Sequence, residues 1–124
     1  YRGWPMIAPS QSTTLDHLAA ILGNATSTAA YRDGTLPFPD GTVLVKLSWE
    51  RVPLSAFQGA YVPGHTESVQ IMVKDSQRYG ATGGWGFGKF VAGRPVSEAE
   101  HQACFGCHAA HAKKHDFVFT QLAP

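Results

Sequence analysis

The stretch GTVLVKLSW, residues 41–49, is apolar on both of the faces that a β-strand would present. Such a run, in a chain divided into short pieces by glycine and proline, is typical of a buried strand. Three further segments are strand candidates. Residues 17–24 (HLAAILGN) are likewise apolar on both faces, residues 67–75 (ESVQIMVKD) alternate, and residues 83–91 (GGWGFGKFV) contain glycines that would allow a flat ligand to approach the backbone. We therefore expect a mainly β (α+β) fold.

Two segments have the start signals of α-helices. Residues 25–32 (ATSTAAYR) are rich in alanine and follow Asn24, a favourable N-cap. Residues 97–114 (SEAEHQACFGCHAAHAKK) begin with Ser97 and Glu100 in the spacing of a capping box, and they end in cations that suit a helix C-terminus. The second segment therefore predicts a C-terminal helix, and this helix carries the motif described below.

The composition indicates one small domain. The chain has 124 residues, of which 44% are hydrophobic, and a chain of this length buries about two thirds of its unfolded surface around one core. No internal repeat or linker divides residues 1–124, so we expect a single domain. The net charge of +1 gives no electrostatic reason to bind nucleic acid, and no apolar run could span a bilayer. Neither nucleic acid nor a membrane is an expected partner.

The segment CFGCH, residues 104–108, contains the only two cysteines of the chain. Thiols at this spacing on one helical turn can add to the two vinyl groups of a haem, and the adjoining imidazole then lies under the iron. The motif therefore predicts one covalent haem c per chain, attached through Cys104 and Cys107. His108 would be the axial iron ligand.

Three other uses of a Cys-x-x-Cys pair are less well supported. A zinc site needs a second pair of ligands, and although His111 and His115 follow closely, no further cysteine is present. A thioredoxin-like motif should open the first helix of a βαβ unit, whereas this one lies near the end of the sequence. The third alternative is a structural disulfide. The histidine directly after the second cysteine favours haem over all three.

Several segments, taken in order, resemble the cytochrome P-460 family, which includes the cytochromes c-prime-beta. The resemblance covers essentially the whole chain and implies a mainly antiparallel β-sheet, usually a homodimer, with one haem whose distal side is open. Members of one group carry a lysine bonded to the haem edge and oxidise hydroxylamine, whereas the c-prime-beta proteins bind nitric oxide or carbon monoxide. The segments are YRGWP at 1–5, FPDGTVLVK at 38–46, VKD at 73–75, GGWGF at 83–87, CFGCH at 104–108 and DFVFT at 116–120.

Covalent haem attachment of this type takes place outside the cytoplasm. The sequence starts with YRGWP and shows neither a basic n-region nor an apolar h-region. We therefore expect a periplasmic protein from which an export signal has been removed.

Lys46 occupies the place of the family's cross-linking lysine. Strand alternation puts it on one face with Leu44 and Ser48. The opposite face is wholly apolar and is therefore the expected core face, which leaves Lys46 to face either the haem or water; the resemblance favours the haem. A solvated lysine at a strand edge is the alternative. The residues of the expected core face are Val43, Val45, Leu47 and Trp49.

Other positions depart from the hydroxylamine-oxidising group. The position of its distal carboxylate matches Gln70, and an amide can hydrogen-bond a ligand but cannot accept a proton at neutral pH. The position of its distal arginine matches Ala19. Glu67 could replace the lost carboxylate, but simple alternation puts it on the opposite strand face from Gln70. These departures favour gas binding over hydroxylamine oxidation.

Further candidates surround the expected haem. Met72 shares the face of Gln70 and could be a sixth iron ligand, although core filling is the commoner role of methionine. A phenylalanine over the distal side would exclude bulky ligands, and the candidates are Phe38, Phe57, Phe87 and Phe90. Basic side chains could pair with the haem propionates, and the candidates are Arg51, Lys74, Arg78 and Lys89.

Three classes of function remain open on these residues. A gas-binding cytochrome needs a five-coordinate iron behind an apolar pocket. An oxidoreductase acting on hydroxylamine or peroxide needs the same open site with a proton acceptor. An electron carrier needs a sixth ligand such as Met72 and a redox partner protein.

Overall fold

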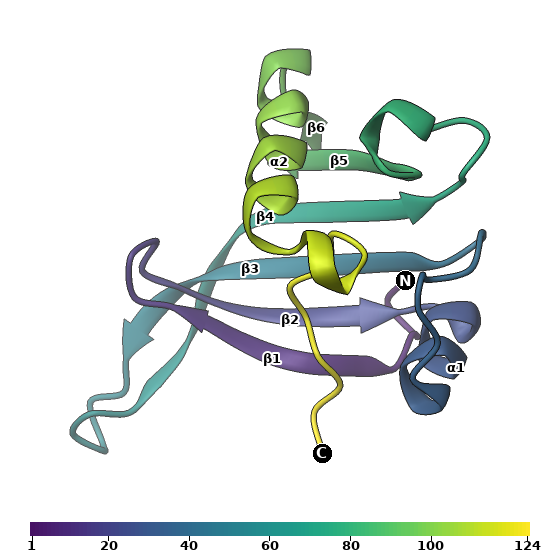
Figure 1. The fold of residues 1–124 in the computed structure, drawn as a ribbon. Coiled ribbons are helices and arrows are strands. Elements are labelled where there is room, and N and C mark those ends of the chain that lie inside the picture. Colours follow the sequence, from purple (N-terminus) through teal and green to yellow (C-terminus); the bar gives the residue numbers. More distant parts are fainter.

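A computed structural model describes residues 1–124, which form one six-stranded antiparallel sheet and two α-helices (Figure 1). The strand order is β1-β2-β3-β4-β5-β6, so each strand pairs with its neighbour in sequence. The fold is therefore mainly β, as expected. The strands are β1 Met6–Ser12, β2 His17–Gly23, β3 Val43–Pro53, β4 Tyr61–Lys74, β5 Trp85–Val91 and β6 Arg94–Pro95. The helices are α1 Ala25–Asp33 and α2 Glu98–His111, with short 3₁₀ turns η1 Gly80–Thr82 and η2 Lys113–His115.

The predicted elements are all present, and two strands were missed. β1 contains Pro9 and several polar residues, and β6 has two residues, so neither has an apolar pattern. Both are edge strands, where a proline is tolerated because one side of the strand needs no ladder hydrogen bonds.

The helix caps follow the sequence signals. The Asn24 side chain accepts a hydrogen bond from the Ser27 backbone N–H, and the capping box of Ser97 and Glu100 forms at the start of α2. The α2 helix ends at His111 instead of residue 114, because the chain continues into η2 and then turns back toward the sheet.

Helix α2 and the C-terminal segment after it cover one face of the sheet, which we call the inner face (Figure 1). The main core cluster lies on this face, where Leu44 of β3 is 4% exposed. The prediction that the core lies on the opposite face of β3 was therefore wrong, although Val45 on that face is buried as well. Alternation separates two faces, but both are apolar enough to be covered. The cluster comprises Ile7, Ile21, Ala30, Phe38, Leu44, Trp85 and Val118.

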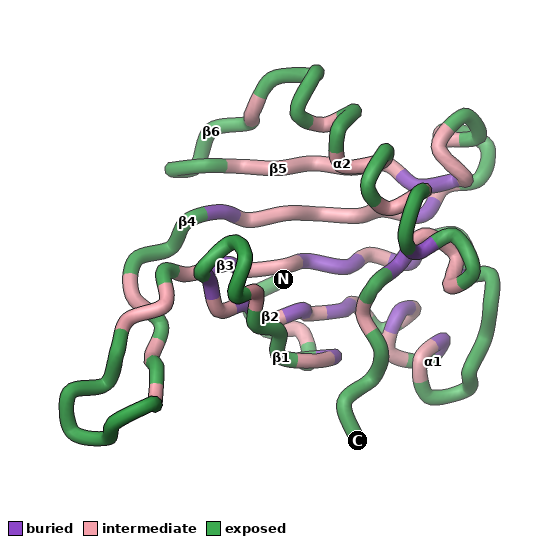
Figure 2. The backbone as a smooth tube through the Cα atoms, turned by 60° about the vertical axis from the view of Figure 1, so that its left-hand side comes forward, coloured by how far each residue is buried: buried purple, intermediate pink, exposed green.

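The β3–β4 hairpin projects beyond the rest of the sheet, and most of its turn is exposed (Figure 2).

Neither of the two helices combines the length and the apolar character that a membrane-spanning helix requires.

Candidate functional site

A cavity of about 480 Å³ lies between the inner face of the sheet, helix α2 and the C-terminal segment. Ten of its 17 lining residues are hydrophobic. A mainly apolar cavity with a few polar groups is typical of a cofactor site.

All three residues of the Cys-x-x-Cys-His motif line this cavity from α2. Both cysteines are free, and the Cys104 thiol donates a hydrogen bond to the Glu100 carbonyl oxygen at 3.3 Å. Burial raises the pKa of the Cys104 thiol, with smaller opposing effects led by Lys89. Two free thiols beside an apolar cavity fit the addition of S–H across the vinyl groups of a haem.

The His108 ring is oriented by the backbone. Its Nδ1 lies 2.6 Å from the Phe117 carbonyl oxygen, and because a carbonyl can only accept, Nδ1–H is the donor and Nε2 is left for a metal. Burial lowers the pKa of His108, the hydrogen bond to Phe117 opposes this effect, and Lys46 adds to it. Phe87 and Phe119 pack edge-on against the ring at 5.1 and 4.8 Å between centroids. A neutral, oriented imidazole fits an axial haem ligand.

A buried ion pair holds the turn that provides the Phe117 carbonyl. Lys74 Nζ on β4 lies 2.9 Å from both carboxylate oxygens of Asp116, and the two side chains are 7% and 9% exposed. Trp85 Nε1–H donates to the Asp116 carbonyl oxygen at 2.8 Å, and the Phe38 backbone N–H donates to its carboxylate. Asp116 and Phe117 both have positive φ angles, so these contacts support a strained turn. Lys74 is thus committed to Asp116, and the suggestion that it pairs with a haem propionate was wrong.

Lys46, Gln70 and Met72 line the cavity from the sheet side. Lys46 is paired with Ile21 on β2 and with Gln70 on β4, so all three lie in one row across the sheet. The Gln70 amide donates to Ser68 Oγ at 3.2 Å. Met72 also packs against the core cluster. The structure therefore brings the sequence-predicted sheet residues to the same cavity as the motif.

The electrostatic surroundings of Lys46 favour its neutral form relative to an exposed lysine. Burial lowers the pKa of Lys46, the Glu67 carboxylate opposes this effect, and Lys89 adds to it. A less protonated amine is a better nucleophile, ligand or base.

Glu67 lies on the inner face, which corrects the expectation from simple alternation. Ser48 pairs with Ser68 and Trp49 pairs with Thr66, so Glu67 is an extra residue in β4 and forms a β-bulge. A bulge changes the direction of the local side chains. The Glu67 carboxylate accordingly lies 3.9 Å from His17 Nδ1 on β2. The sequence contains no signal for this bulge.

The other candidates are scattered. Phe87 lines the cavity but packs on His108, Phe38 belongs to the core, and Phe57 is 69% exposed. Arg51 is bound to Asp16 at the β1–β2 turn.

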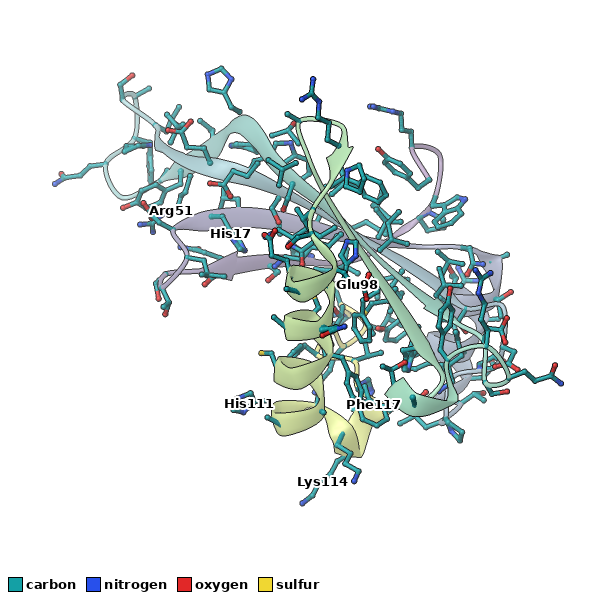
Figure 3. The ribbon with its side chains drawn as sticks, turned by 90° about the horizontal axis from the view of Figure 1, so that it is seen from above. His17, Arg51, Glu98, His111, Lys114 and Phe117 are labelled. Atoms are coloured by element: carbon teal, nitrogen blue, oxygen red, sulfur yellow. The ribbon has the colours of Figure 1, made fainter.

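The histidines that follow the motif do not lie together on one exposed helix face. His111 is exposed and points away from the sheet (Figure 3). His115 lies in η2 instead of α2, where its Nδ1 is hydrogen-bonded to the Val118 carbonyl oxygen at 2.9 Å.

Two parts of the cavity wall were not predicted. Ser10 and Ser12 of β1 and Leu15 of the following turn line it, as do Phe119 and Thr120 of the C-terminal segment. β1 has no strand pattern, and the C-terminal segment has no secondary structure from which its position could be inferred.

Comparison with known proteins agrees with this site. No curated protein matches the chain. A family model described as Cytochrome P460 matches residues 1–120. The family implies a haem cofactor, and the free cysteines, the oriented His108 and the apolar cavity fit one. Because the match covers almost the whole sequence, this chain belongs to the cytochrome P460 family.

Proposed function

We propose that this protein is a mono-haem c-type cytochrome whose open distal side binds nitric oxide or carbon monoxide. The haem would be held covalently by Cys104 and Cys107, with His108 Nε2 on the iron. When bound, the haem supplies the iron that takes up the gas. The observation that carries the proposal is the shared cavity, which has the motif on one side and an amide, Gln70, on the sheet side.

The surroundings of Gln70 and Met72 support gas binding over the two alternatives. Gln70 has no titratable proton acceptor and is engaged with Ser68, so it suits a ligand that needs no deprotonation. Met72 pairs with Leu44 and Phe87 in the register and packs on the core, as a core-filling residue does. An open iron site behind an apolar wall favours a small, weakly polar ligand.

Optical spectroscopy of the purified holoprotein tests this proposal. We expect a high-spin, five-coordinate spectrum at rest, uptake of carbon monoxide by the ferrous protein, and haem that remains attached after acid-acetone extraction. The same resting spectrum is expected for Met72→Leu. A low-spin parent that becomes high-spin in Met72→Leu would identify Met72 as an axial ligand and would support the electron-transfer alternative.

A second candidate function is oxidation of hydroxylamine or peroxide chemistry with a bond between Lys46 and the haem edge. It is favoured by the position of Lys46 in the cavity and by the lowered pKa of its amine. Formation of one C–N bond with loss of a C–H and an N–H would reduce the intact mass by about two hydrogens after treatment with an oxidant such as peroxide. Lys46→Ala is the matched control, and equal changes of mass and spectrum on peroxide treatment in both proteins would exclude this candidate.

We further propose a periplasmic location and a homodimer, both in line with the haem chemistry and the family. Light scattering of the purified holoprotein measures the assembly state. A redox partner protein is needed if the iron cycles between oxidation states.

A further inference from the structure

Two buried polar atoms near the cavity have no hydrogen-bond partner in the protein. They are His17 Nε2 and Ser48 Oγ, and their residues are 5% and 1% exposed. Buried polar atoms are almost always paired with protein groups or with ordered water. These two atoms therefore indicate a small polar position that another molecule completes.

Both side chains lie on the inner face of the sheet. Ser48 is two residues from Lys46 on β3, which puts both on the same face, and it pairs with Ala19 on β2. His17 on β2 pairs with Ser12 on β1, and Ser12 lines the cavity. His17 and Ser48 are thus diagonal neighbours across the β2–β3 pair, about 7–8 Å apart, a distance that the imidazole ring and one water together can span.

The Glu67 bulge adds a carboxylate to this position. Glu67 Oε2 lies 3.9 Å from His17 Nδ1, and the glutamate side chain is 44% exposed, so it connects the buried imidazole to solvent. A negative charge beside Nδ1 favours a proton on that nitrogen and leaves Nε2 as the acceptor. The inner-face location of His17 can be followed in Figure 3.

The charges around His17 are few. Lys46 on β3 and Glu67 on β4 both influence it: burial lowers the pKa of His17, Lys46 adds to this effect, and Glu67 opposes it. Glu50, opposite His17 in the register, directs its carboxylate toward Gly64. Asp16 is bound to Arg51. β1 contributes the uncharged Ser12.

We propose that His17, Ser48 and Glu67 form a proton-binding subsite beside the cavity, next to the lining residues Ser12 and Lys46, in which one ordered water joins His17 Nε2 to Ser48 Oγ. When an external electron donor reduces the haem iron by one electron, His17 Nε2 takes up one proton from solvent by way of the ordered water. The added proton offsets the added electron. The new N–H bond forms as an O–H bond of the ordered water breaks, and that water regains a proton from solvent. This inference rests on the proposed haem site, but it does not depend on which ligand the iron binds.

Potentiometry of the holoprotein as a function of pH tests the proton uptake. The midpoint potential of the parent should fall as pH rises through the titration of His17, because reduction then requires a proton that is harder to obtain. His17→Gln keeps a hydrogen-bonding side chain but cannot titrate, so its potential should lose this dependence. His65→Gln changes an exposed histidine on β4 and should behave like the parent. An identical pH dependence in His17→Gln and the parent would overturn the proposal.

A crystal structure of the holoprotein tests the water. We expect a water within hydrogen-bond distance of both His17 Nε2 and Ser48 Oγ, and its loss in Ser48→Ala. A dry position, or two atoms paired with protein groups, would overturn the proposal. Neither measurement uses gas binding. A protein that takes up no carbon monoxide but shows the water and the His17-dependent potential would therefore refute the proposed function and leave this subsite standing.

Discussion

At the scale of single residues, the site depends on backbone groups as much as on side chains. The proximal histidine is oriented by the carbonyl of Phe117, a residue with a positive φ angle, and the Phe117 ring lies against Gly83. Gly83 also has a positive φ angle of 66°. A substitution at Gly83 or Phe117 should therefore change the orientation of the His108 ring, although Gly83 does not contact His108 directly.

Gly83→Ala should destabilise the protein and disturb the haem ligand. A Cβ at Gly83 would approach the Phe117 ring closely, and such overpacking costs about 1–3 kcal/mol. Gly93→Ala is the matched control, because Gly93 has a φ angle of 75° but nothing lies within 4 Å of its added Cβ. Chemical denaturation and the haem spectrum measure both effects. Equal losses of stability in the two variants would mean that only backbone strain matters.

His17 should make stability depend on pH. Burial lowers its pKa in the folded protein, so as pH falls below 6.5, the usual value, the unfolded chain binds the proton first. Stability is therefore complete above that pH and decreases below it, until the lowered folded pKa is reached. Denaturant unfolding at several pH values between 7.5 and 5 should show a smaller acid loss in His17→Gln than in the parent. Parallel curves would contradict this prediction.

At the scale of secondary-structure elements, two connections tie the sheet to the site. The bulge in β4 brings Glu67 to the inner face, and the Lys74–Asp116 pair joins the end of β4 to the turn after η2. Glu67 and Lys74 both lie on β4, the strand that also carries Gln70 and Met72. β4 thus determines the geometry on both sides of the cavity.

Lys74→Met should be strongly destabilising, because it leaves the Asp116 carboxylate buried without its cation. Removal of one partner of a buried pair typically costs about 3–5 kcal/mol. The double variant Lys74→Met/Asp116→Asn removes both charges and should recover a large part of this loss. Denaturant unfolding measures the stabilities, and the haem spectrum reports any displacement of the Phe117 carbonyl from His108. A double variant no more stable than Lys74→Met would show that the charge pair is not the cause.

At the scale of the whole molecule, the cavity lies between α2 and most of the sheet that it covers. No residue of α2 is buried, and its main contacts with the sheet are to β5. A cofactor that fills the cavity would therefore connect the helix to the strands. The core cluster beside α1 does not depend on the cofactor, because its side chains already pack against one another.

Haem should protect α2 more than it protects the sheet. Hydrogen exchange of the α2 amides should be much faster in the Cys104→Ser/Cys107→Ser variant prepared without haem than in the holoprotein, because the helix loses its main packing surface. Amides of β2 and β3, which lie in the centre of the sheet, serve as the internal control and should change little. Equal protection of α2 with and without haem would contradict this expectation.

The sequence by itself determined four of the six strands, the starts of both helices and the position of the Cys-x-x-Cys-His motif on α2. These features depend on local patterns, namely apolar runs, capping residues and spacing along one turn, which act within a few residues. The cavity position of Lys46 followed from the family resemblance, because the alternation argument had put the core on the opposite face of β3.

Only the tertiary structure decided which face of β3 carries the main core, because the choice depends on where α1 and the C-terminal segment pack and not on which face is the more apolar. It also decided that Glu67 lies beside His17, since a bulge arises from the register between two strands and leaves no mark in either one. Lys74 has a buried partner 42 residues away, and no local pattern links the two. Contacts between distant segments depend on the whole packing arrangement, and for this reason they were beyond the reach of the sequence patterns.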